Sequence, residues 1–355
     1  MKTKSKSKLV AMILMALCVI TSGLQSLQAG VAYKIVWSHY TGWEPWQYAK
    51  DSGILAAQAK KYGVELELQL LNDYGETITR YTSDKTVVAL AVTEMDALTG
   101  PCVGGVDTTV LILGDFSNGN DGIVLKKGKS VKDLVGREIM LVENSVSHYL
   151  LYRALGENKI PIKDVKTKNV SDADVASLFT AAPDNAATVT WNPPLMTVRQ
   201  VKGATMVFDS SKVPGEILDL LIVRTDAPEG VKKALVGTWY EVMKIMNGKG
   251  GNTEAAIDAM AKSAGGTRAE FDSQLKTTFM FYDPAKAVEF IKDAKLKQTM
   301  DYVRKFCFDR GLYNGAASPD YVGIEFPDGS VLGSKRNIKL RFNTKYMEAA
   351  AAGKL

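Results

Sequence analysis

The chain has very few of the residues that most often hold metal ions or act as nucleophiles and bases. Its 355 residues include three cysteines and two histidines. Cys18 lies in the N-terminal apolar run, which leaves Cys102 and Cys307, and two cysteines are too few for a zinc site. This pair is consistent either with a disulfide in an oxidising compartment or with buried free thiols.

The sequence also lacks the short motifs of the common catalytic mechanisms. It contains no G-x-S-x-G, H-E-x-x-H or C-x-x-C pattern. The segment "GIVLKKGKS" is not a phosphate-binding loop, because five residues separate Gly122 from Gly128 where such a loop has four. We therefore expect a protein that is not an enzyme and that uses no catalytic residue, no cofactor and no metal ion.

A strong net charge is absent as well. The chain has 44 Lys and Arg against 39 Asp and Glu, a formal net charge of +5. Four of these charges come from Lys2, Lys4, Lys6 and Lys8, so the rest of the chain is close to neutral. Because nucleic-acid binding requires a basic surface, we expect no nucleic-acid partner.

One apolar run stands near the N-terminus, and no later run approaches membrane length. The basic residues "MKTKSKSK" precede "LVAMILMALCVI", and small and polar residues follow. The run is shorter than the roughly 20 apolar residues of a membrane-spanning helix, so the pattern predicts a cleaved export signal over residues 1–32. The cut falls after Ala29 or Ala32, and Leu17 before Cys18 argues against a lipid anchor. We expect a periplasmic protein.

Short β-branched runs alternate with amphipathic stretches along the remaining chain, as is typical of α/β proteins. Strands are predicted at residues 33–37, 64–70, 86–93, 108–116, 122–127, 138–142, 165–170, 187–191, 204–209 and 217–224, and helices at 43–63, 75–85, 147–159, 173–179, 228–247 and 284–311. Asp328 and Gly329 predict the turn of a hairpin over residues 324–333. The alternation predicts parallel sheets with helices on both faces.

An aromatic loop, "WSHYTGWEPW", follows the first predicted strand directly. Ligands of open α/β sheets bind beyond the carboxyl ends of the strands, so we expect this loop to form one wall of a cleft. Trp43 and Trp46 are the candidates for that wall. Trp46 is also placed to seat the following helix on its sheet, and the sequence leaves this alternative open.

Four segments together resemble the periplasmic substrate-binding proteins of ABC importers of the nitrate, sulfonate and taurine type. They are "GWEPWQYAKDSGIL", "VALAVTEMDALTGP", "VKDLVGREIMLVENSVSHYLLYRAL" and "DNAATVTWNPP". Within this group the chain is most similar to the binding proteins encoded beside urea carboxylase, which are attributed to uptake of urea or a relative such as guanidine. The resemblance implies a monomer that binds a small-molecule solute and works with the transmembrane subunits of an ABC permease.

The resemblance also implies a fold, an α/β, two-lobed periplasmic binding protein of type II. Each lobe is a βαβ sheet with flanking helices, and two chain segments form the hinge. Lobe 1 is discontinuous, over residues 33–116 and 218–312, and lobe 2 covers 117–217. A C-terminal hairpin and tail occupy residues 313–355. We expect the two hinge segments at Phe116 to Asp121 and at Val213 to Ile217.

The expected ligand-binding residues are the polar and aromatic side chains at strand ends. Asn144, Ser145 and Ser147 precede a helix whose free N–H groups face the cleft, although either serine is equally consistent with a plain helix cap. His148 is equally consistent with a contact to the ligand in the cleft and with packing of the helix. The remaining candidates are Trp43, Glu44, Trp46, Glu94, Asp115, Asp121, Trp191 and Asn192. Any one of these carboxylates is also consistent with a capping role.

These candidates favour a nitrogen-rich solute of the urea or guanidine class. A planar cation would use a carboxylate for paired hydrogen bonds and an aromatic face for a cation–π contact, supplied by Trp43 with Glu44 and by Trp191 with Asn192. A thiamine-precursor pyrimidine is the main alternative. Alkylsulfonate, taurine and nitrate are less favoured, because the cleft loops offer only Lys126 and Lys127 as nearby cations. The alternative from a different class of protein is an enzyme similar to a pyrimidine synthase. Such an enzyme relies on a cysteine-rich segment that this chain lacks.

Overall fold

The computed structural model describes residues 32–313 and 315–355, so nearly all of the predicted export signal lies outside the described residues. Residues from Ala32 onward group as one compact unit. The strands are β1 (Tyr33–Trp37), β2 (Leu66–Leu70), β3 (Val87–Thr93), β4 (Thr108–Ser117), β5 (Asp121–Leu125), β6 (Glu138–Leu141), β7 (Lys166–Asn169), β8 (Ala187–Trp191), β9 (Thr205–Asp209), β10 (Leu218–Arg224), β11 (Thr278–Met280), β12 (Gly323–Glu325), β13 (Val331–Leu332) and β14 (Ile338–Phe342).

Helices connect and cover these strands. The α-helices are α2 (Pro45–Asp51), α3 (Ile54–Lys61), α4 (Tyr74–Ser83), α5 (Glu94–Ala97), α6 (Val146–Glu157), α7 (Asp172–Ala181), α8 (Pro194–Arg199), α9 (Glu229–Met246), α10 (Thr253–Ser263), α11 (Arg268–Leu275), α12 (Pro284–Lys292), α13 (Ala294–Asp309) and α14 (Lys345–Ala351). Short helical turns occur at η1 (Leu98–Cys102), η2 (Val131–Leu134), η3 (Ile162–Asp164) and η4 (Ser210–Lys212).

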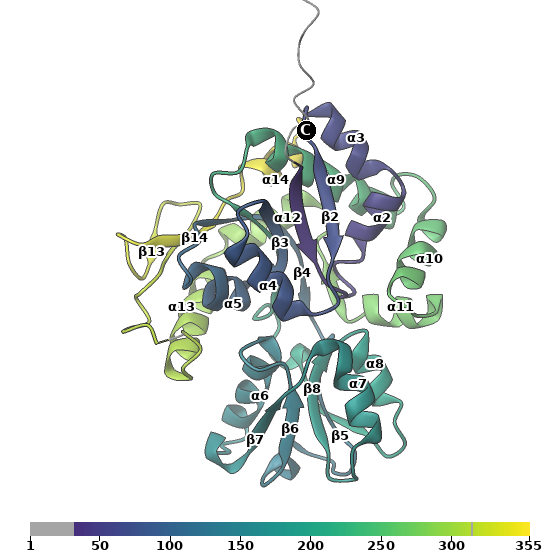
Figure 1. Ribbon diagram of the computed structural model, residues 1–355, viewed down its shortest axis with the longest axis vertical. Coiled ribbons are helices and arrows are strands. Elements are labelled where there is room, and N and C mark those ends of the chain that lie inside the picture. The colour runs from purple at the N-terminus through teal and green to yellow at the C-terminus, as the bar shows by residue number, and fades with distance from the viewer. Residues whose placement is uncertain (1–31, 314) are drawn as a thin grey trace, which may run out of the picture. The chain divides into compact units, whose positions relative to one another are not determined.

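The strands form two sheets, each the centre of one lobe. The larger sheet has the order β13-β12-β14-β4-β10-β3-β1-β2, with β11 paired to β4, and the smaller has the order β7-β6-β8-β5-β9. Helices α6, α7 and α8 lie with the smaller sheet, whereas α2, α3, α4 and α9 lie with the larger one (Figure 1). This is the two-lobed α/β fold that the resemblance implied. The exact lobe boundaries given above stay a prediction.

Both sheets are mixed, which corrects the prediction of parallel sheets. Strands β1, β2 and β3 pair in parallel, but β10 runs antiparallel to β3 and β4. In the smaller sheet β5 is antiparallel to β8 and β9. The physical reason lies in the connection: β4 leads out of the larger sheet and β10 returns beside it, with the Ser117 N–H donating to the Ile217 carbonyl at 3.0 Å. A strand that returns at the edge where its neighbour left must run the opposite way.

The C-terminal segment is part of the larger sheet. The predicted hairpin is confirmed, since β12 and β13 pair antiparallel on either side of Asp328 and Gly329. Strand β14 then pairs in parallel with both β12 and β4. Strands β12, β13 and β14 thus extend the sheet of the larger lobe.

Two segments predicted as single helices are each divided in two. Gly53 separates α2 from α3 with a φ of 80°, a left-handed conformation that glycine adopts without the steric cost of a Cβ. Asp293 separates α12 from α13 in an extended conformation, and its side chain caps α13 by accepting a hydrogen bond from the Lys295 N–H. Hydrophobic periodicity continues across both breaks, so it did not reveal them.

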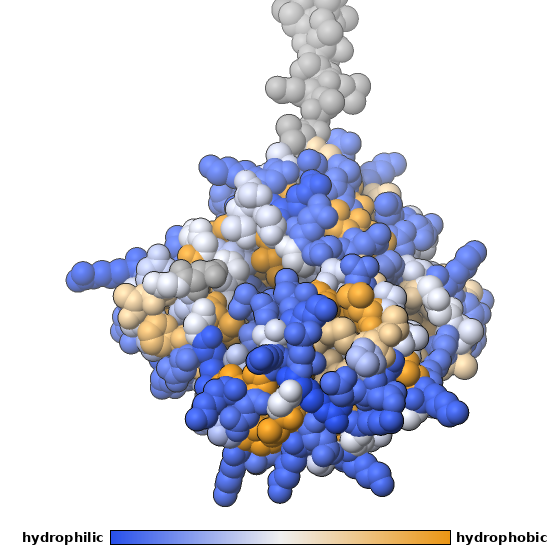
Figure 2. Space-filling view, turned by 60° about the horizontal axis from the view of Figure 1, so that its bottom comes forward, coloured by the Kyte–Doolittle hydropathy of each residue, from blue (hydrophilic) through white to orange (hydrophobic). Residues whose placement is uncertain are grey.

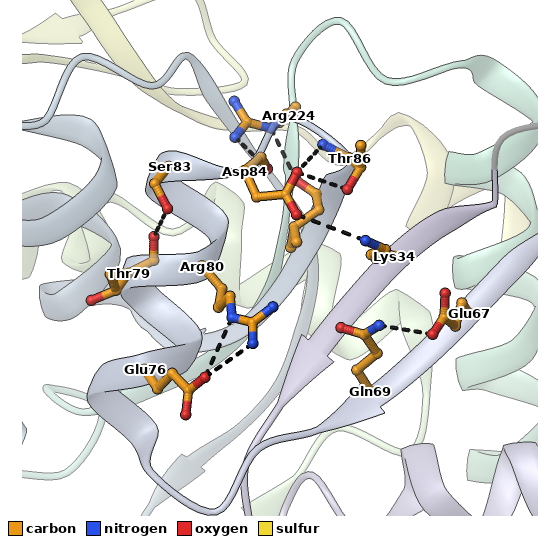
Figure 3. A network of polar contacts seen from close by, with 11 residues as sticks. Lys34, Glu67, Gln69, Glu76, Thr79, Arg80, Ser83, Asp84, Thr86 and Arg224 are labelled. Atoms are coloured by element: carbon orange, nitrogen blue, oxygen red, sulfur yellow. Dashed lines mark hydrogen bonds and ion pairs between the residues drawn. The ribbon is translucent and has the colours of Figure 1, made fainter.

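A polar network fixes the end of α4 that lies away from the smaller sheet (Figure 3). Asp84 accepts hydrogen bonds from the N–H and hydroxyl of Thr86 at 2.8 and 2.7 Å, which lower the pKa of its carboxyl group. Arg224 of β10 donates to the backbone carbonyls of Asp84 and Val87 at 3.2 and 3.0 Å. These contacts anchor the end of α4 to β3 and β10.

The described residues decide between the two states of the cysteine pair that were left open above. Cys102 and Cys307 are both buried free thiols, so the disulfide alternative is wrong. Among the described residues no helix is long and apolar enough to cross a membrane, and no group of His, Cys, Asp and Glu is arranged to hold a metal ion. The face seen in Figure 2 is largely hydrophilic, with separate hydrophobic patches.

Candidate functional site

A small cavity lies where the two lobes meet. The volume that the centre of a water-sized sphere can occupy in it is about 10 Å³, roughly the room of one water molecule, so a solute can enter only if the lining side chains or the lobes move apart. The larger lobe and the returning segment supply most of the lining, and the smaller lobe supplies the rest. The lining residues are Tyr40, Trp43, Tyr74, Thr93, Asp121, Val146, Trp191, Ile217 and Asp219.

The sheet edge of the larger lobe contributes a row of three polar residues. Asp219 of β10 is in register with Thr93 at the end of β3 and with Asp115 near the end of β4. The row exists because β10 runs antiparallel to its neighbours, so its first residues meet the last residues of β3 and β4. Asp115 and Asp219 are 0% and 2% exposed.

The loop after β1 supplies the aromatic wall. Tyr40 donates a hydrogen bond to Asp115 Oδ1 at 3.0 Å, and its ring packs against Trp43 with centroids 5.1 Å apart. Gly42 allows this close approach, because a Cβ at that position would lie 2.2 Å from Asp115 Oδ2. The hydrogen bond from Tyr40 thus holds the loop against the row of polar residues, and the absence of a side chain at Gly42 leaves room for this contact.

The smaller lobe faces this wall with a carboxyl group and an indole ring. Asp121 begins β5 and Trp191 ends β8, and the two residues are direct partners in the antiparallel pairing. Trp191 packs edge to face against Tyr74 with centroids 5.5 Å apart, and Tyr74 in turn contacts Trp43 at 5.7 Å. The three rings form a continuous aromatic surface across the two lobes.

Three buried carboxyl groups dominate the electrostatics of the cavity. Burial raises the pKa of Asp115 and of Asp121 to about 7, and hydrogen bonds from Tyr40 and Ser117 respectively offset part of that effect. Burial and the nearby Asp115 and Asp121 raise the pKa of Asp219 well above its usual value. One oxygen of each group has no hydrogen-bond partner among the described residues.

No side chain in the described lining offers a compensating positive charge, since lysine, arginine and histidine are all missing from it. A buried carboxylate is strongly disfavoured unless it is paired or fully hydrogen-bonded. The cavity is therefore electrostatically complementary to a cation with N–H donors, and it is poorly matched to an anion. Its aromatic walls add a cation–π surface.

Several predicted residues lie near the cavity without lining it. Glu44 is buried, and its Oε1 accepts a hydrogen bond from protonated His39 Nδ1 at 2.6 Å, which raises the pKa of His39. Trp46 packs against Trp239 of α9, with ring centroids 5.2 Å apart, and does not line the cavity. Glu94 is buried and accepts a hydrogen bond from the Leu218 N–H at 2.7 Å, at the start of β10.

The residues around the start of α6 are mostly used for local structure. Ser145 is the N-cap, and its hydroxyl accepts from the Ser147 N–H at 3.2 Å and donates to the Val142 carbonyl at 2.7 Å. Asn144 is exposed and donates from its N–H to His148 Nδ1 at 3.2 Å. The pKa of His148 is lowered by burial. Ser147 is fully buried, and its hydroxyl has no partner among the described residues.

Asn192 acts as a connector between the lobes. Its side-chain amide donates to Asn120 Oδ1, and Asn120 in turn donates to the Thr278 hydroxyl at 2.8 Å. Asn192 precedes a cis peptide bond to Pro193. Of the twelve predicted site residues, the structure brings together Trp43, Asp121 and Trp191 in the lining, with Asp115 directly behind it.

Sequence reasoning missed Tyr40, Tyr74, Thr93 and Asp219. Asp219 carried a usable signal, because it is the one charged residue inside the apolar run "ILDLLIV". Tyr40 lay within the aromatic loop but was not singled out. Tyr74 and Thr93 gave no signal, since an aromatic at a helix start and a threonine at a strand end are both ordinary.

This arrangement, two α/β lobes joined by two chain segments around a buried cavity, is the fold of the periplasmic binding proteins. Solved structures support that assignment. The alkanesulfonate-binding protein SsuA from Xanthomonas axonopodis pv. citri, bound to MOPS, has a TM-score of 0.64 and 14% identity, covering 80% of this chain and 94% of that one. The Escherichia coli aliphatic sulphonate binding protein SsuA has a TM-score of 0.63 and 16% identity, covering 79% and 93%.

A Candida albicans protein described as having the generic periplasmic binding protein fold is also similar. Its TM-score is 0.59 at 11% identity, covering 77% of this chain and 90% of that one. The sequence itself matches the model of the family described as "NMT1/THI5 like" over residues 49–236. The chain belongs to this family. No curated protein matches the sequence.

Proposed function

We propose that this protein is the extracytoplasmic solute-binding component of an ABC importer. It captures a small nitrogen-rich cation of the guanidinium class between its lobes and delivers it to the permease. The family, the fold and the sequence pattern of an export signal support the class of protein. The solute class rests on one observation: Asp121 and Asp219 line an aromatic-walled cavity, the buried Asp115 lies directly behind it, and the described lining contains no basic side chain.

Guanidinium fits this cavity better than urea. Both are planar and rich in N–H donors, but only guanidinium carries a positive charge that would favour the ionised form of a carboxyl group in the lining, Asp121 or Asp219. Hydrogen bonds to charged groups are stronger than those between neutral groups. Trp43 and Trp191 provide aromatic faces for the same cation.

Two alternative solutes are distinguished from guanidinium by the binding experiment described below. A protonated aminopyrimidine would use the same carboxyl groups and stack on the same rings. An alkylsulfonate, the ligand class named for the two bacterial relatives, would need positive groups that the described lining does not contain. Catalysis is not proposed, because burial raises the pKa of Cys102 and of Cys307, and neither thiol lines the cavity.

Isothermal titration of the purified protein, stripped of co-purified solute, tests this proposal. We expect saturable 1:1 binding of guanidinium, with urea at least tenfold weaker because it lacks the charge. Tighter binding of the aminopyrimidine would leave the role of solute-binding component in place, and the aminopyrimidine would replace guanidinium as the proposed solute. Binding of taurine or nitrate in preference to every cation would overturn the solute class.

A further inference from the structure

A buried hydrogen bond joins the first turns of two helices that belong to different lobes. The backbone N–H of Tyr74, the first residue of α4, donates to Asp172 Oδ1 at 3.1 Å. Asp172 is the first residue of α7 and is 6% exposed. Neither residue lies on the chain segments that lead from β4 to β5 and from β9 to β10. The bond is therefore made only while the two lobes lie against each other.

The start of α4 needs an acceptor from outside its own helix. The first N–H groups of a helix have no acceptor within it, and a buried N–H group without a partner is costly. Tyr74 is 2% exposed. The N-cap residue of α4, Asp73, accepts from the Glu76 N–H at 2.8 Å, further along the helix. Asp172 of the other lobe supplies the acceptor for the Tyr74 N–H.

The charge of Asp172 strengthens this contact. Its carboxyl group lies at the N-terminal end of α7 as well as at that of α4, and a negative charge is stabilised at the positive ends of helices. Burial raises the pKa of Asp172 to about 6, and the Tyr74 N–H offsets part of that effect. The carboxyl group is therefore mostly ionised at about pH 8, where its hydrogen bond is stronger than one between neutral groups.

Tyr74 connects this contact to the wall of the cavity. Its side chain lines the cavity, and its ring contacts Trp43 of the larger lobe and Trp191 of the smaller lobe. Its hydroxyl donates to Asp96 Oδ2 at 2.8 Å, so the far end of the side chain is fixed to the larger lobe. The hydrogen bond to Asp172 holds the backbone of the same residue against the lobe that carries Trp191.

We propose that Asp172 is a positioning residue for solute binding. It is absent from the described lining of the cavity, and it acts through Tyr74 by stabilising the closed arrangement, in which Tyr74 and Trp191 meet. A solute enters only if the lining side chains or the lobes move apart, so a contact made in the closed arrangement alone raises the fraction of the protein that can retain the solute. The inference rests on the proposed solute-binding function and adds a residue that sets the affinity without touching the solute.

The first measurement is isothermal titration of Asp172 variants with guanidinium. Asp172→Ala removes the acceptor, and we expect its affinity to fall about tenfold, because the buried Tyr74 N–H loses its partner in the closed arrangement. Asp172→Asn keeps a side-chain oxygen that can accept the same hydrogen bond but carries no charge, so we expect a loss of only about threefold.

The second measurement is the radius of gyration by small-angle X-ray scattering well below Tm, which a residue that merely supports its own helix would not change. Without solute, we expect Asp172→Ala to have a larger radius of gyration than the unmodified protein, because its lobes part more often. Saturating guanidinium should bring both proteins to the same value, since the bound solute itself holds the lobes together. The value for ligand-free Asp172→Asn should lie between the two.

Asp174→Ala is the matched control. Asp174 lies in the first turn of the same helix and carries the same charge, but its carboxyl group accepts from the Ser171 hydroxyl at 2.8 Å, within the smaller lobe. We expect its affinity for guanidinium and its radius of gyration to match those of the unmodified protein, although its Tm falls with the loss of this contact. Equal effects of Asp174→Ala and Asp172→Ala would show that the charge at the start of α7 is responsible, and they would overturn the role of Asp172.

A folded Asp172→Ala protein with unchanged affinity, or with lower affinity and an unchanged radius of gyration, would also overturn the inference. If this variant does not fold, Asp172→Leu decides the matter under the same expectations, because leucine has the branched shape of aspartate and no acceptor. The scattering comparison without solute keeps the two proposals apart. Failure of the unmodified protein to bind guanidinium would remove the proposed solute, and the radius of gyration of the ligand-free variants would still test Asp172.

Discussion

The ring of Tyr74 lies edge to face against the ring of Trp191, with centroids 5.5 Å apart and planes at 76°. Tyr74 begins α4 beside the larger sheet, and Trp191 ends β8 of the smaller sheet. The N–H of Tyr74 also donates to Asp172 Oδ1 at 3.1 Å, at the start of α7. One residue therefore joins the lobes through both a ring contact and a hydrogen bond, and the same residue lines the cavity.

Removing an indole from this aromatic surface should weaken ligand binding. We expect Trp43→Ala and Trp191→Ala each to lose about tenfold in affinity for guanidinium, because a desolvated cation–π contact contributes roughly 1–2 kcal/mol. Isothermal titration measures the effect. Trp46→Phe is the control, since Trp46 packs on Trp239 outside the cavity, and its affinity should match that of the unmodified protein. Unchanged affinity in both cavity variants would place the ligand elsewhere.

Neutralising one carboxyl group of the cavity should weaken cation binding more strongly than removing one indole ring does. Hydrogen bonds to charged groups contribute about 1.5–3 kcal/mol, so we expect Asp121→Asn and Asp219→Asn each to bind guanidinium roughly 10- to 100-fold less tightly. Urea, which is neutral, should lose much less. Asp133→Asn, in the exposed capping box of η2, serves as the charge-matched control. Equal losses for guanidinium and urea would contradict the charged contact.

The stability of the ligand-free protein should fall as the pH rises from about 5 to 8. Burial raises the pKa of Asp115 and of Asp121 to about 7, and that of Asp219 higher still. A carboxyl group with a raised pKa in the folded state binds its proton more tightly there, so the free energy of unfolding decreases between the unfolded pKa near 4 and the folded pKa. His39, whose pKa is raised by Glu44, acts in the same direction, and His148, whose pKa is lowered by burial, opposes it.

A bound cation should reverse this trend, because it favours the ionised carboxylates. We expect saturating guanidinium to raise Tm more at pH 8 than at pH 6, and binding to release protons, seen as a dependence of the titration heat on the buffer. Scanning calorimetry at both pH values measures the first effect. A ligand-induced shift in Tm that does not change with pH would show that these carboxyl groups do not meet the ligand.

The second chain segment between the lobes should owe much of its anchoring to Glu216. Arg153 of α6 donates to both of its oxygens, at 2.7 and 3.0 Å, and the Tyr149 hydroxyl donates at 2.7 Å. We expect Glu216→Ala to lower the free energy of unfolding by about 2 kcal/mol, because it removes charge-assisted hydrogen bonds from a partly buried site. Calorimetry measures the change. Glu289→Ala, which breaks an exposed ion pair with Lys286, should leave Tm unchanged.

The sequence predicted individual elements well where their pattern was local. The strand at residues 33–37 matches β1 residue for residue, and the predicted helix at 228–247 differs from α9 by one residue at each end. The elements that were not predicted are helices α5, α8, α10, α11 and α14 and strands β11 and β14. The breaks at Gly53 and Asp293 were also missed, because hydrophobic periodicity runs through them, and only the packing of the flanking helices selects the break.

The candidate site was predicted less completely, for a different reason. Trp43, Asp121 and Trp191 stood out because aromatic and acidic residues at strand ends are conspicuous in any α/β sequence. Whether a given carboxyl group faces a cavity or a helix end depends on contacts between distant segments. Glu44 meets His39 and Glu94 meets the Leu218 N–H, and neither pairing is visible in the spacing of the residues.

The sequence by itself determined the α/β alternation, the near-neutral charge beyond the first residues, the scarcity of cysteine and histidine, and the aromatic loop after the first strand. These are properties of composition and local period. The tertiary structure alone decided that Asp121 and Asp219 line one cavity and that Asp115 lies beside Asp219 directly behind it. The physical reason is the return of β10 antiparallel to β4, which brings residues about a hundred positions apart in the chain into register at the edge where the two lobes meet.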